Sequence, residues 1–291
     1  MTHGRTLIEA KVPSKYLGTN RMVRIYLPPS YGSAPRRRYP VLYLHDGQNV
    51  FSAAGTNCCF GWGSWELDRI VDELSASNRM QEILIVAVDT SRARYSEYRG
   101  PIYAGGRAGK QEAPSRFDNY ANFLTQELKP KIDREYRTRP AAANTAVMGS
   151  SLGGICSLAL AWEHPKVFGA AASLSGSYQI EKRNFLENGL RSYRGRRKPI
   201  RLYLDSGTID FTGDDDGRKH TEAVAAELRR IGWKDGVQLQ HFVEAQPMSE
   251  AELERAGLRR DKWHEARTSQ HNEFYWRQRV WRALEFLFSP K

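Results

Sequence analysis

The sequence predicts an α/β fold, with a mostly parallel sheet of about eight strands and helices on both faces. Short apolar runs, such as 83–88, alternate along the 291 residues with segments whose apolar residues recur at helical spacing. This alternation is typical of βαβ units, and continuous apolar runs are typical of strands buried on both faces. The composition, 40% hydrophobic and 26% charged, is that of a globular protein.

Eight strands and five helices can be placed along the chain. The strands are expected at residues 6–12, 22–27, 40–44, 83–88, 145–148, 170–174, 200–204 and 237–243. The helices are expected at 65–75, 117–128, 155–162 and 216–231, with a C-terminal helix that carries Trp276, Val280, Leu284 and Leu287 on one stripe. Pro130 is expected to end or kink the second helix. Residues 89–116 lack periodicity and are expected to form a long loop.

No internal repeat or linker divides the chain, so we predict one domain over residues 1–291. The charged stretch 246–268, after the last strand, is interpreted as an insertion. Three cysteines do not make a disulfide framework. Cys156 falls in a predicted helix, where it acts as a small buried hydrophobe. The adjacent Cys58 and Cys59 are either an ordinary loop pair or a vicinal redox pair.

The formal net charge of +11 favours attraction to polyanions or anionic substrates. No nucleic-acid motif accompanies the basic runs, so we predict no nucleic-acid partner. No apolar stretch approaches the ~18 residues of a membrane span, so we predict no membrane partner. The first twelve residues are charged and lack a secretory apolar core, which leads us to expect a cytoplasmic protein.

A nucleophile motif lies at Gly149-Ser150-Ser151-Leu152-Gly153. The pattern G-x-S-x-G places a serine on a sharp turn between a strand and a helix, and small flanking residues relieve crowding there. A short apolar strand precedes the motif and a helical segment follows it. Only Ser151, unlike Ser150, has glycines two residues away on both sides. The sequence therefore predicts a nucleophile at Ser151 on an α/β-hydrolase fold, against the alternative of a glycine-rich turn without chemistry.

A serine hydroxyl needs a base, and in this fold the chain order is serine, acid, histidine. Asp205 and Asp210 compete for the acid, because both follow the strand at 200–204. Asp210 is favoured, since it lies in the loop beyond the strand. His264 and His271 compete for the base, and His271 is favoured because it directly precedes the C-terminal helix.

No metal or cofactor is expected. Asp214-Asp215-Asp216-Gly217 has some likeness to a calcium loop, but Thr212 and Ala223 occupy positions that would need acids, so a helix N-terminus is the better interpretation. No HExxH pattern is present. Acyl transfer also needs donors for the oxyanion. The backbone N–H of Leu152 is one candidate, and the backbone of Gln48 or Gly47 supplies the other.

With these residues in place, the chain resembles the putative-esterase family of the α/β-hydrolases, which includes esterase D, enterochelin esterases, and feruloyl and acetyl-xylan esterases. The matching segments are Tyr43 to Phe51, Trp65 to Asp68, Leu128 to Asp133, Tyr136 to Thr138, Gly149 to Gly154, His271 to Trp276 and Leu284 to Phe288. The resemblance implies Ser151 as nucleophile, Asp210 as acid, His271 as base and Gln48 as the second oxyanion amide.

The implied activity is that of a carboxylic ester hydrolase working through an acyl-enzyme on a small acyl, aryl or sugar ester, feruloyl-, acetyl- or siderophore-like. The alternatives are an acyltransferase with the same triad and a non-catalytic carbohydrate- or polyanion-binding protein. Asp46, Trp62 and Tyr178 are candidate substrate-binding residues. The abundance of arginine suggests an anionic ester, and a homo-oligomer is compatible with the sequence.

Overall fold

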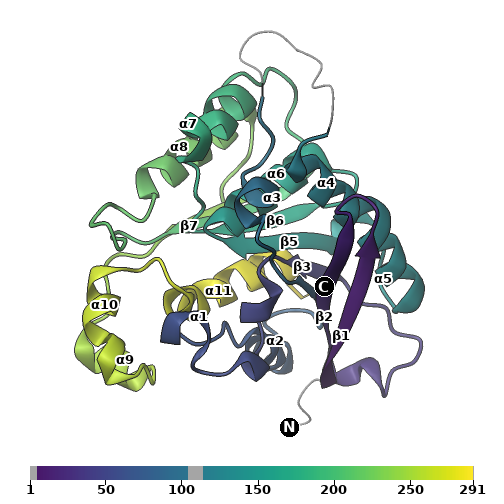
Figure 1. Cartoon of the computed structure of the whole chain (residues 1–291), viewed down its shortest axis with the longest axis horizontal. Coiled ribbons are helices and arrows are strands. Elements are labelled where there is room, and N and C mark those ends of the chain that lie inside the picture. Colours follow the sequence, from purple (N-terminus) through teal and green to yellow (C-terminus); the bar gives the residue numbers. More distant parts are fainter. Residues whose placement is uncertain (1–4, 104–113, 291) are drawn as a thin grey trace.

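The computed structural model describes residues 5–103 and 114–290, and its centre is one eight-stranded sheet (Figure 1). Its strands run in the order β1-β2-β4-β3-β5-β6-β7-β8. Their bounds are β1 Arg5–Ser14, β2 Thr19–Leu27, β3 Val41–Leu44, β4 Leu84–Val88, β5 Thr145–Ser150, β6 Ala170–Leu174, β7 Arg201–Ser206 and β8 Leu239–Val243. The predicted strands are thus all present.

The sheet is antiparallel at one end and parallel elsewhere. β1 pairs antiparallel with β2, and β2 pairs antiparallel with β4. From β4 through β3, β5, β6 and β7 to β8, every pairing is parallel. The prediction of a mostly parallel α/β sheet is confirmed. Because parallel strands all end at one edge, the loops that follow them gather there.

Helices cover both faces of this sheet. The α-helical segments are α1 Cys58–Gly61, α2 Leu67–Ala76, α3 Arg94–Tyr98, α4 Arg116–Asn122, α5 Lys129–Glu135, α6 Leu152–Glu163, α7 Ile180–Asn184, α8 Arg218–Ile231, α9 Glu250–Arg255, α10 Trp263–Thr268 and α11 Glu273–Phe288. Figure 1 shows α2 and α11 on one side of the sheet, with α3, α4 and α6 on the other.

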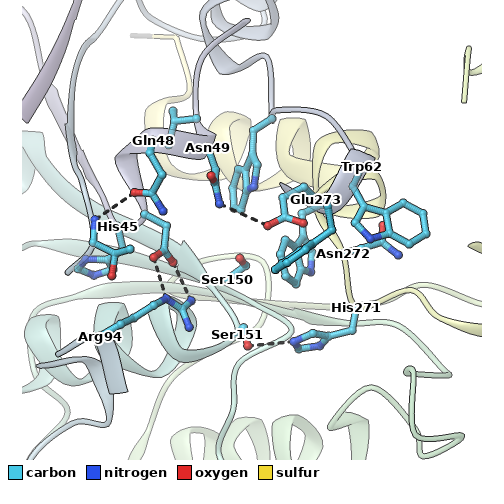
Figure 2. A pocket seen from close by; sticks show the side chains of 16 residues that line it. His45, Gln48, Asn49, Trp62, Arg94, Ser150, Ser151, His271, Asn272 and Glu273 are labelled. Atoms are coloured by element: carbon cyan, nitrogen blue, oxygen red, sulfur yellow. Dashed lines mark hydrogen bonds and ion pairs between the residues drawn. The ribbon is translucent and has the colours of Figure 1, made fainter. Parts of the chain in front are cut away.

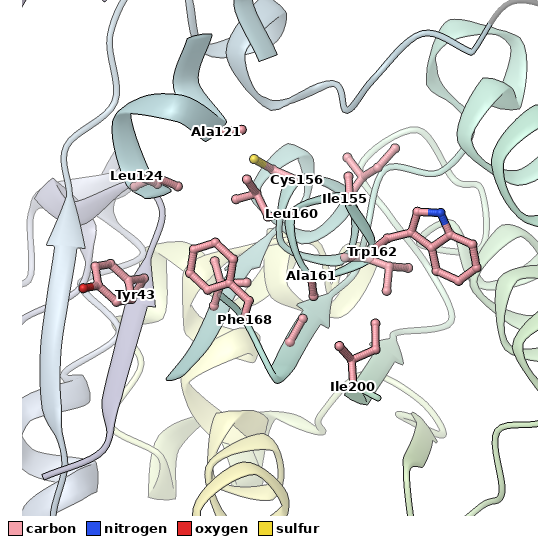
Figure 3. Close-up of a cluster of buried hydrophobic side chains, with 14 of the residues drawn as sticks. Tyr43, Ala121, Leu124, Ile155, Cys156, Leu160, Ala161, Trp162, Phe168 and Ile200 are labelled. Atoms are coloured by element: carbon pink, nitrogen blue, oxygen red, sulfur yellow. The ribbon is translucent and has the colours of Figure 1, made fainter. Parts of the chain in front are cut away.

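Two buried clusters hold these layers together. The larger lies under α4, α5, α6 and α8 and includes Tyr43, Leu160, Trp162 and Phe168 (Figure 3). The second joins α2 and α11 to the opposite face. Helix α6 is buried along almost its whole length, because it follows the central strand β5 and is covered by neighbours on both sides. Cys156 is fully buried within it, as expected of a small hydrophobe.

Three segments differ from the predictions or add to them. Pro130 does not end its helix: α4 continues through the π-helical turn η4 (Phe123–Leu128) into α5, because Pro130 stands in the first turn of α5. The expected loop at 89–116 contains the short helix α3, and its residues 104–113 lie outside the described part. The stretch 246–268 forms α9 and α10.

No helix in residues 5–103 or 114–290 is long and apolar enough to cross a bilayer.

Candidate active site

Ser151 stands on the sharp turn between β5 and α6. Its backbone has φ 56° and ψ −122°, a combination that non-glycine residues rarely adopt. Gly149 is needed beside it, because a Cβ at that position would lie 2.8 Å from the carbonyl carbon of Gly153. The motif therefore folds as the strained elbow that the sequence predicted, with the serine side chain at the carboxyl edge of the sheet.

His271 lies against this serine from the loop before α11. Its Nε2 is 2.9 Å from the Ser151 Oγ, across 120 residues of sequence. The imidazole packs edge-on against Trp276, with ring centroids 5.1 Å apart. The backbone N–H of His271 donates to the Ser269 hydroxyl at 3.2 Å. The structure thus brings Ser151 and His271 together, while His264 lies on α10 and makes no such contact among the described hydrogen bonds.

The carboxylate that meets His271 is Asp216, and not Asp210. The Asp216 Oδ1 lies 2.6 Å from His271 Nδ1, and the Asp216 side chain is almost completely buried. Asp210 instead closes its own turn: its Oδ1 accepts from the backbone N–H and hydroxyl of Thr212 and from the backbone N–H of Asp214. The prediction of Asp210 as the partner of His271 is therefore corrected to Asp216.

Asp216 is held by donors from several elements. Its Oδ2 accepts from the Ser175 hydroxyl at 2.6 Å and from the Gly207 backbone N–H. Burial disfavours its charge, but the hydrogen bond and charge of His271, together with the Arg279 guanidinium, outweigh burial and lower the pKa of Asp216. Asp216 is therefore ionised at neutral pH and fixes the Nδ1 proton of His271, leaving Nε2 to face the serine.

A second buried carboxylate, Asp205, lies behind this site. Arg279, 1% exposed, donates to Asp205 at 3.0 Å and to Ser175 at 2.5 Å, and its Nη2 is 3.8 Å from Asp216. Trp276 also donates to Ser175, at 3.1 Å. Asp205, the rival acid at the end of β7, thus pairs with arginine, and within the described residues it has no hydrogen bond to His271.

A cavity of about 380 Å³ opens over Ser151 and His271 (Figure 2). Its remaining walls come from the loops after β3 and β4, the Phe60 to Trp65 segment, α3, the end of β5 and the start of α11. They comprise His45, Asp46, Gln48, Asn49, Val50, Phe60, Trp62, Trp65, Thr90, Arg94, Ser150, Asn272, Glu273 and Trp276. Trp62 lines this cavity as predicted, whereas Tyr178 is fully buried and donates to Ser173, so Tyr178 cannot contact a ligand there.

The loop after β3 turns tightly beside Ala87. Asp46 has a left-handed backbone, φ 55°, and begins the 3₁₀ turn η2 (Gly47–Asn49). A Cβ at Gly47 would lie 2.7 Å from the backbone of Ala87, so only glycine fits there. The Gln48 side chain accepts from the Thr90 backbone N–H at 3.0 Å, which holds the turn against the loop after β4.

The two predicted oxyanion amides are placed by these turns. Asn49 and Val50 donate the backbone bonds of η2, so the N–H of Gln48 is outside the turn's own hydrogen bonding. Leu152 is the first residue of α6, where Gly154 and Ile155 donate the first bonds to Ser151. An N–H at that position has no partner within its helix. Gln48 lines the cavity together with Ser151.

Asp46 does not present a free carboxylate to the cavity. Its two oxygens each accept from Arg94 of α3, at 2.7 Å and 2.7 Å. This planar bidentate pair is the stronger kind of ion pair. Arg94 was not among the predicted site residues, because it falls in the stretch 89–116 that shows no periodicity. Asp46 therefore shapes the cavity wall through Arg94.

Glu273 is a second cavity carboxylate that the sequence analysis did not single out. It is the first residue of α11, two positions after His271, and its Oε1 lies 3.5 Å from the Asn49 Nδ2. Burial, and secondarily the neighbouring Asp46, raises the pKa of Glu273. Its place directly after His271-Asn272 in a matching motif was the available signal.

The described residues contain no group of three or more His, Cys, Asp or Glu that could hold a metal ion. A buried carboxylate, an imidazole and a serine hydroxyl are joined in sequence by hydrogen bonds of 2.6 and 2.9 Å. This arrangement suits removal of the serine proton during attack on a carbonyl carbon.

Known proteins share this fold and sequence pattern. The profile of the family described as "Putative esterase" matches residues 14–287. The uncharacterized protein YbbA of Bacillus subtilis (strain 168) is 24% identical over 169 residues, which cover 58% of this chain and 61% of that relative. The chain thus spans about six tenths of the length of this curated relative.

Two solved structures have the same fold. A ferulic acid esterase superposes with a TM-score of 0.68 at 18% identity, covering 97% of this chain and 98% of that one. The enterobactin esterase FES from Shigella flexneri, solved in the presence of enterobactin, gives a TM-score of 0.69 at 19% identity, covering 97% of this chain and 58% of that one. By the match over residues 14–287, the chain belongs to the putative esterase family, with the α/β-hydrolase fold.

Proposed function

We propose that this protein is a serine esterase that hydrolyses small carboxylic esters with Ser151, His271 and Asp216 as its catalytic triad. The observation that carries the proposal is the continuous hydrogen-bonded chain from the Ser151 Oγ through both nitrogens of His271 to the buried Asp216. Membership of the esterase family supports the same reaction class.

The reaction proceeds in two acyl-transfer steps. His271 Nε2 takes the Ser151 proton as the serine Oγ attacks the ester carbonyl carbon, and Asp216 stabilises the imidazolium that forms. The tetrahedral intermediate collapses when the C–O bond to the alcohol breaks and His271 protonates the leaving oxygen. Water then attacks the acyl-enzyme with His271 again as the base. The carboxylic acid leaves and Ser151 regains its proton.

The oxyanion of each intermediate is assigned to the backbone N–H groups of Gln48 and Leu152. Leu152 stands at the N-terminus of α6, where the helix dipole and a free N–H both favour negative charge. Gly47 lets Gln48 approach the cavity through a turn that no larger residue could form. Donors of this kind contribute roughly 3–4 kcal/mol each to lowering the barrier.

The substrate class is a small acyl, aryl or sugar ester. A cavity of about 380 Å³ suits a small molecule, and Phe60, Trp62 and Trp65 give it aromatic walls. The proteins of similar fold are named a ferulic acid esterase and an enterobactin esterase, which supports an ester substrate. Phe211, 76% exposed and 6.1 Å from the His271 ring, adds an aromatic surface beside the base.

Hydrolysis of a short-chain p-nitrophenyl ester tests the proposal, with a serine-directed phosphonate and the variant Ser151→Ala. We expect turnover in the native protein, loss of turnover on labelling, and tandem mass spectrometry that places the label on Ser151 and not on the adjacent Ser150. Wild-type turnover by folded Ser151→Ala would overturn the triad. Formation of new esters when alcohols are added would assign an acyltransferase instead.

A further inference from the structure

One charged group in the cavity, outside the proposed triad, has no ion-pair partner among the described residues. Three charged side chains line the cavity besides His271, namely Asp46, Arg94 and Glu273. Asp46 and Arg94 neutralise each other through two hydrogen bonds of 2.7 Å. The remaining group, Glu273, has no ion pair with lysine or arginine among the described residues.

Glu273 faces the cavity and not bulk solvent. A glutamate at the first position of a helix usually lies in water and interacts with the helix dipole. Here the side chain is half-buried, points towards Asn49, and lies between the Trp62 wall and the triad (Figure 2). The Asn49 amide donates to it over a long 3.5 Å, and the Cys59 thiol also hydrogen-bonds to it. A carboxylate has about four acceptor sites, so Glu273 can still accept from a bound molecule.

The positive charge of the chain lies mainly elsewhere. The basic runs 36–38 and 191–198 precede β3 and β7, so they lie at the amino edge of the sheet, opposite the site. Lys262 is nearer, 4.9 Å from the Trp62 ring, but it pairs with Glu265 and does not line the cavity. The net charge of +11 therefore does not describe the surface that meets the substrate.

We propose that Glu273 is a specificity-determining residue of the ester site. Its carboxylate selects esters that carry a hydroxyl or another uncharged hydrogen-bond donor near the scissile bond, and it rejects esters with a carboxylate at the same place. In a protein cavity a second anion beside the Glu273 carboxylate would be repelled, whereas a hydroxyl can donate to it. This inference rests on the proposed ester hydrolysis, and it reverses the expectation of an anionic substrate.

Two pairs of matched esters test the selection on both sides of the bond. Ethyl butyrate and monoethyl succinate differ by a carboxylate on the acyl side, and 2-hydroxyethyl acetate and acetoxyacetate differ on the alcohol side. Hydrolysis is followed by proton release at pH 8. We expect the native protein to prefer the neutral member of at least one pair by about tenfold or more in kcat/KM.

Three variants separate this role from a structural one. Glu273→Gln removes the charge at nearly constant shape, and we expect the anionic-to-neutral ratio of kcat/KM to rise about tenfold in that pair, mainly through a lower KM for the anionic ester. Glu273→Asp keeps the charge and should keep the native ratio. Glu135→Gln removes one charge from α5, outside the cavity, and should also keep the native anionic-to-neutral ratio.

An unchanged ratio in folded Glu273→Gln, on both pairs, would overturn the inference while leaving ester hydrolysis standing. A native protein that prefers both anionic esters would likewise overturn the inference and leave ester hydrolysis standing. Absence of turnover on all four esters, with no phosphonate label on Ser151, would overturn the proposed function itself. Thermal melting of each variant shows that it is folded before its ratio is compared.

Discussion

His271 meets Asp216, six residues beyond Asp210, through a hydrogen bond of 2.6 Å between Nδ1 and Oδ1. Asp216 has a left-handed backbone, φ 53°, just before the start of α8. The Asp216 carboxylate is therefore held by the beginning of a helix and by donors from Ser175 and Gly207, and not by the strand end alone.

The variant Asp216→Asn should lower kcat by roughly 10³–10⁴-fold, because an amide cannot hold His271 in the tautomer that accepts the serine proton. Asp210→Asn is the matched control and should stay within about threefold, since its side chain closes only an exposed turn. Both are measured with the same p-nitrophenyl ester. A larger loss in the Asp210 variant would return the acid role to that residue.

Removal of the buried Arg279 should destabilise the protein. Arg279→Met leaves Asp205 and Asp216 without their guanidinium in a site from which water is excluded, and we expect a loss of about 3–5 kcal/mol in the free energy of unfolding. Arg218→Met, which breaks an exposed pair with Glu222, should cost at most about 1 kcal/mol. Urea denaturation compares the two, and equal losses would contradict the prediction.

His45 should make the stability pH-dependent. Burial, assisted by the charge of Arg94, lowers the pKa of His45 to about 3, whereas the unfolded chain takes up its proton near pH 6.5. Between these values the unfolded state holds the extra proton, so stability falls as the pH drops from 6.5 towards 3. The contribution to the slope approaches about 1.4 kcal/mol per pH unit.

His45→Gln removes this titration and retains a partner for Tyr120, whose hydroxyl lies 2.9 Å from His45 Nδ1. Denaturation midpoints at pH 5, 6 and 7.5 should therefore depend less on pH in the variant than in the native protein. The same slope in both proteins would show that His45 does not supply the difference.

Gly149→Ala should damage the elbow that carries Ser151. Its methyl group would lie 2.8 Å from the carbonyl carbon and oxygen of Gly153, and backbone atoms cannot move aside as a side chain can. We expect a loss of about 1–3 kcal/mol in unfolding free energy, with reduced ester turnover. Gly32→Ala meets no atom within 4 Å and is the matched control. Calorimetry of both variants checks the prediction.

The strands and the pairing of Ser151 with His271 could be predicted from the sequence. A buried strand needs only a local apolar run, and the serine elbow needs only small residues at fixed spacing. The position of His271 before the last helix followed from chain order. These features depend on local sequence or on order along the chain, and the structure contains each of them.

The carboxylate that meets His271 could not be predicted in the same way, because its position depends on how residues 207–216 fold back. Both Asp210 and Asp216 follow β7, and Asp216 also fits the interpretation as a residue at a helix start. Only the packing of α8 and α11 decides between them. The prediction that Tyr178 contacts the substrate was wrong for a related reason, since aromatic residues in loops pack inwards as readily as they line cavities.

The turn that contains Asp210 has a consequence for how this enzyme could change. At the base of the turn, the Gly207 backbone N–H donates to Asp216. At its tip, Asp210 accepts from the backbone N–H groups of Thr212 and Asp214. Phe211, at that tip, faces the solvent beside His271. Insertions, deletions or substitutions in this turn would therefore alter the surface beside His271 without displacing Asp216. The sequence of this turn can therefore vary, in evolution or in a mutant library, while Asp216 and His271 keep their positions.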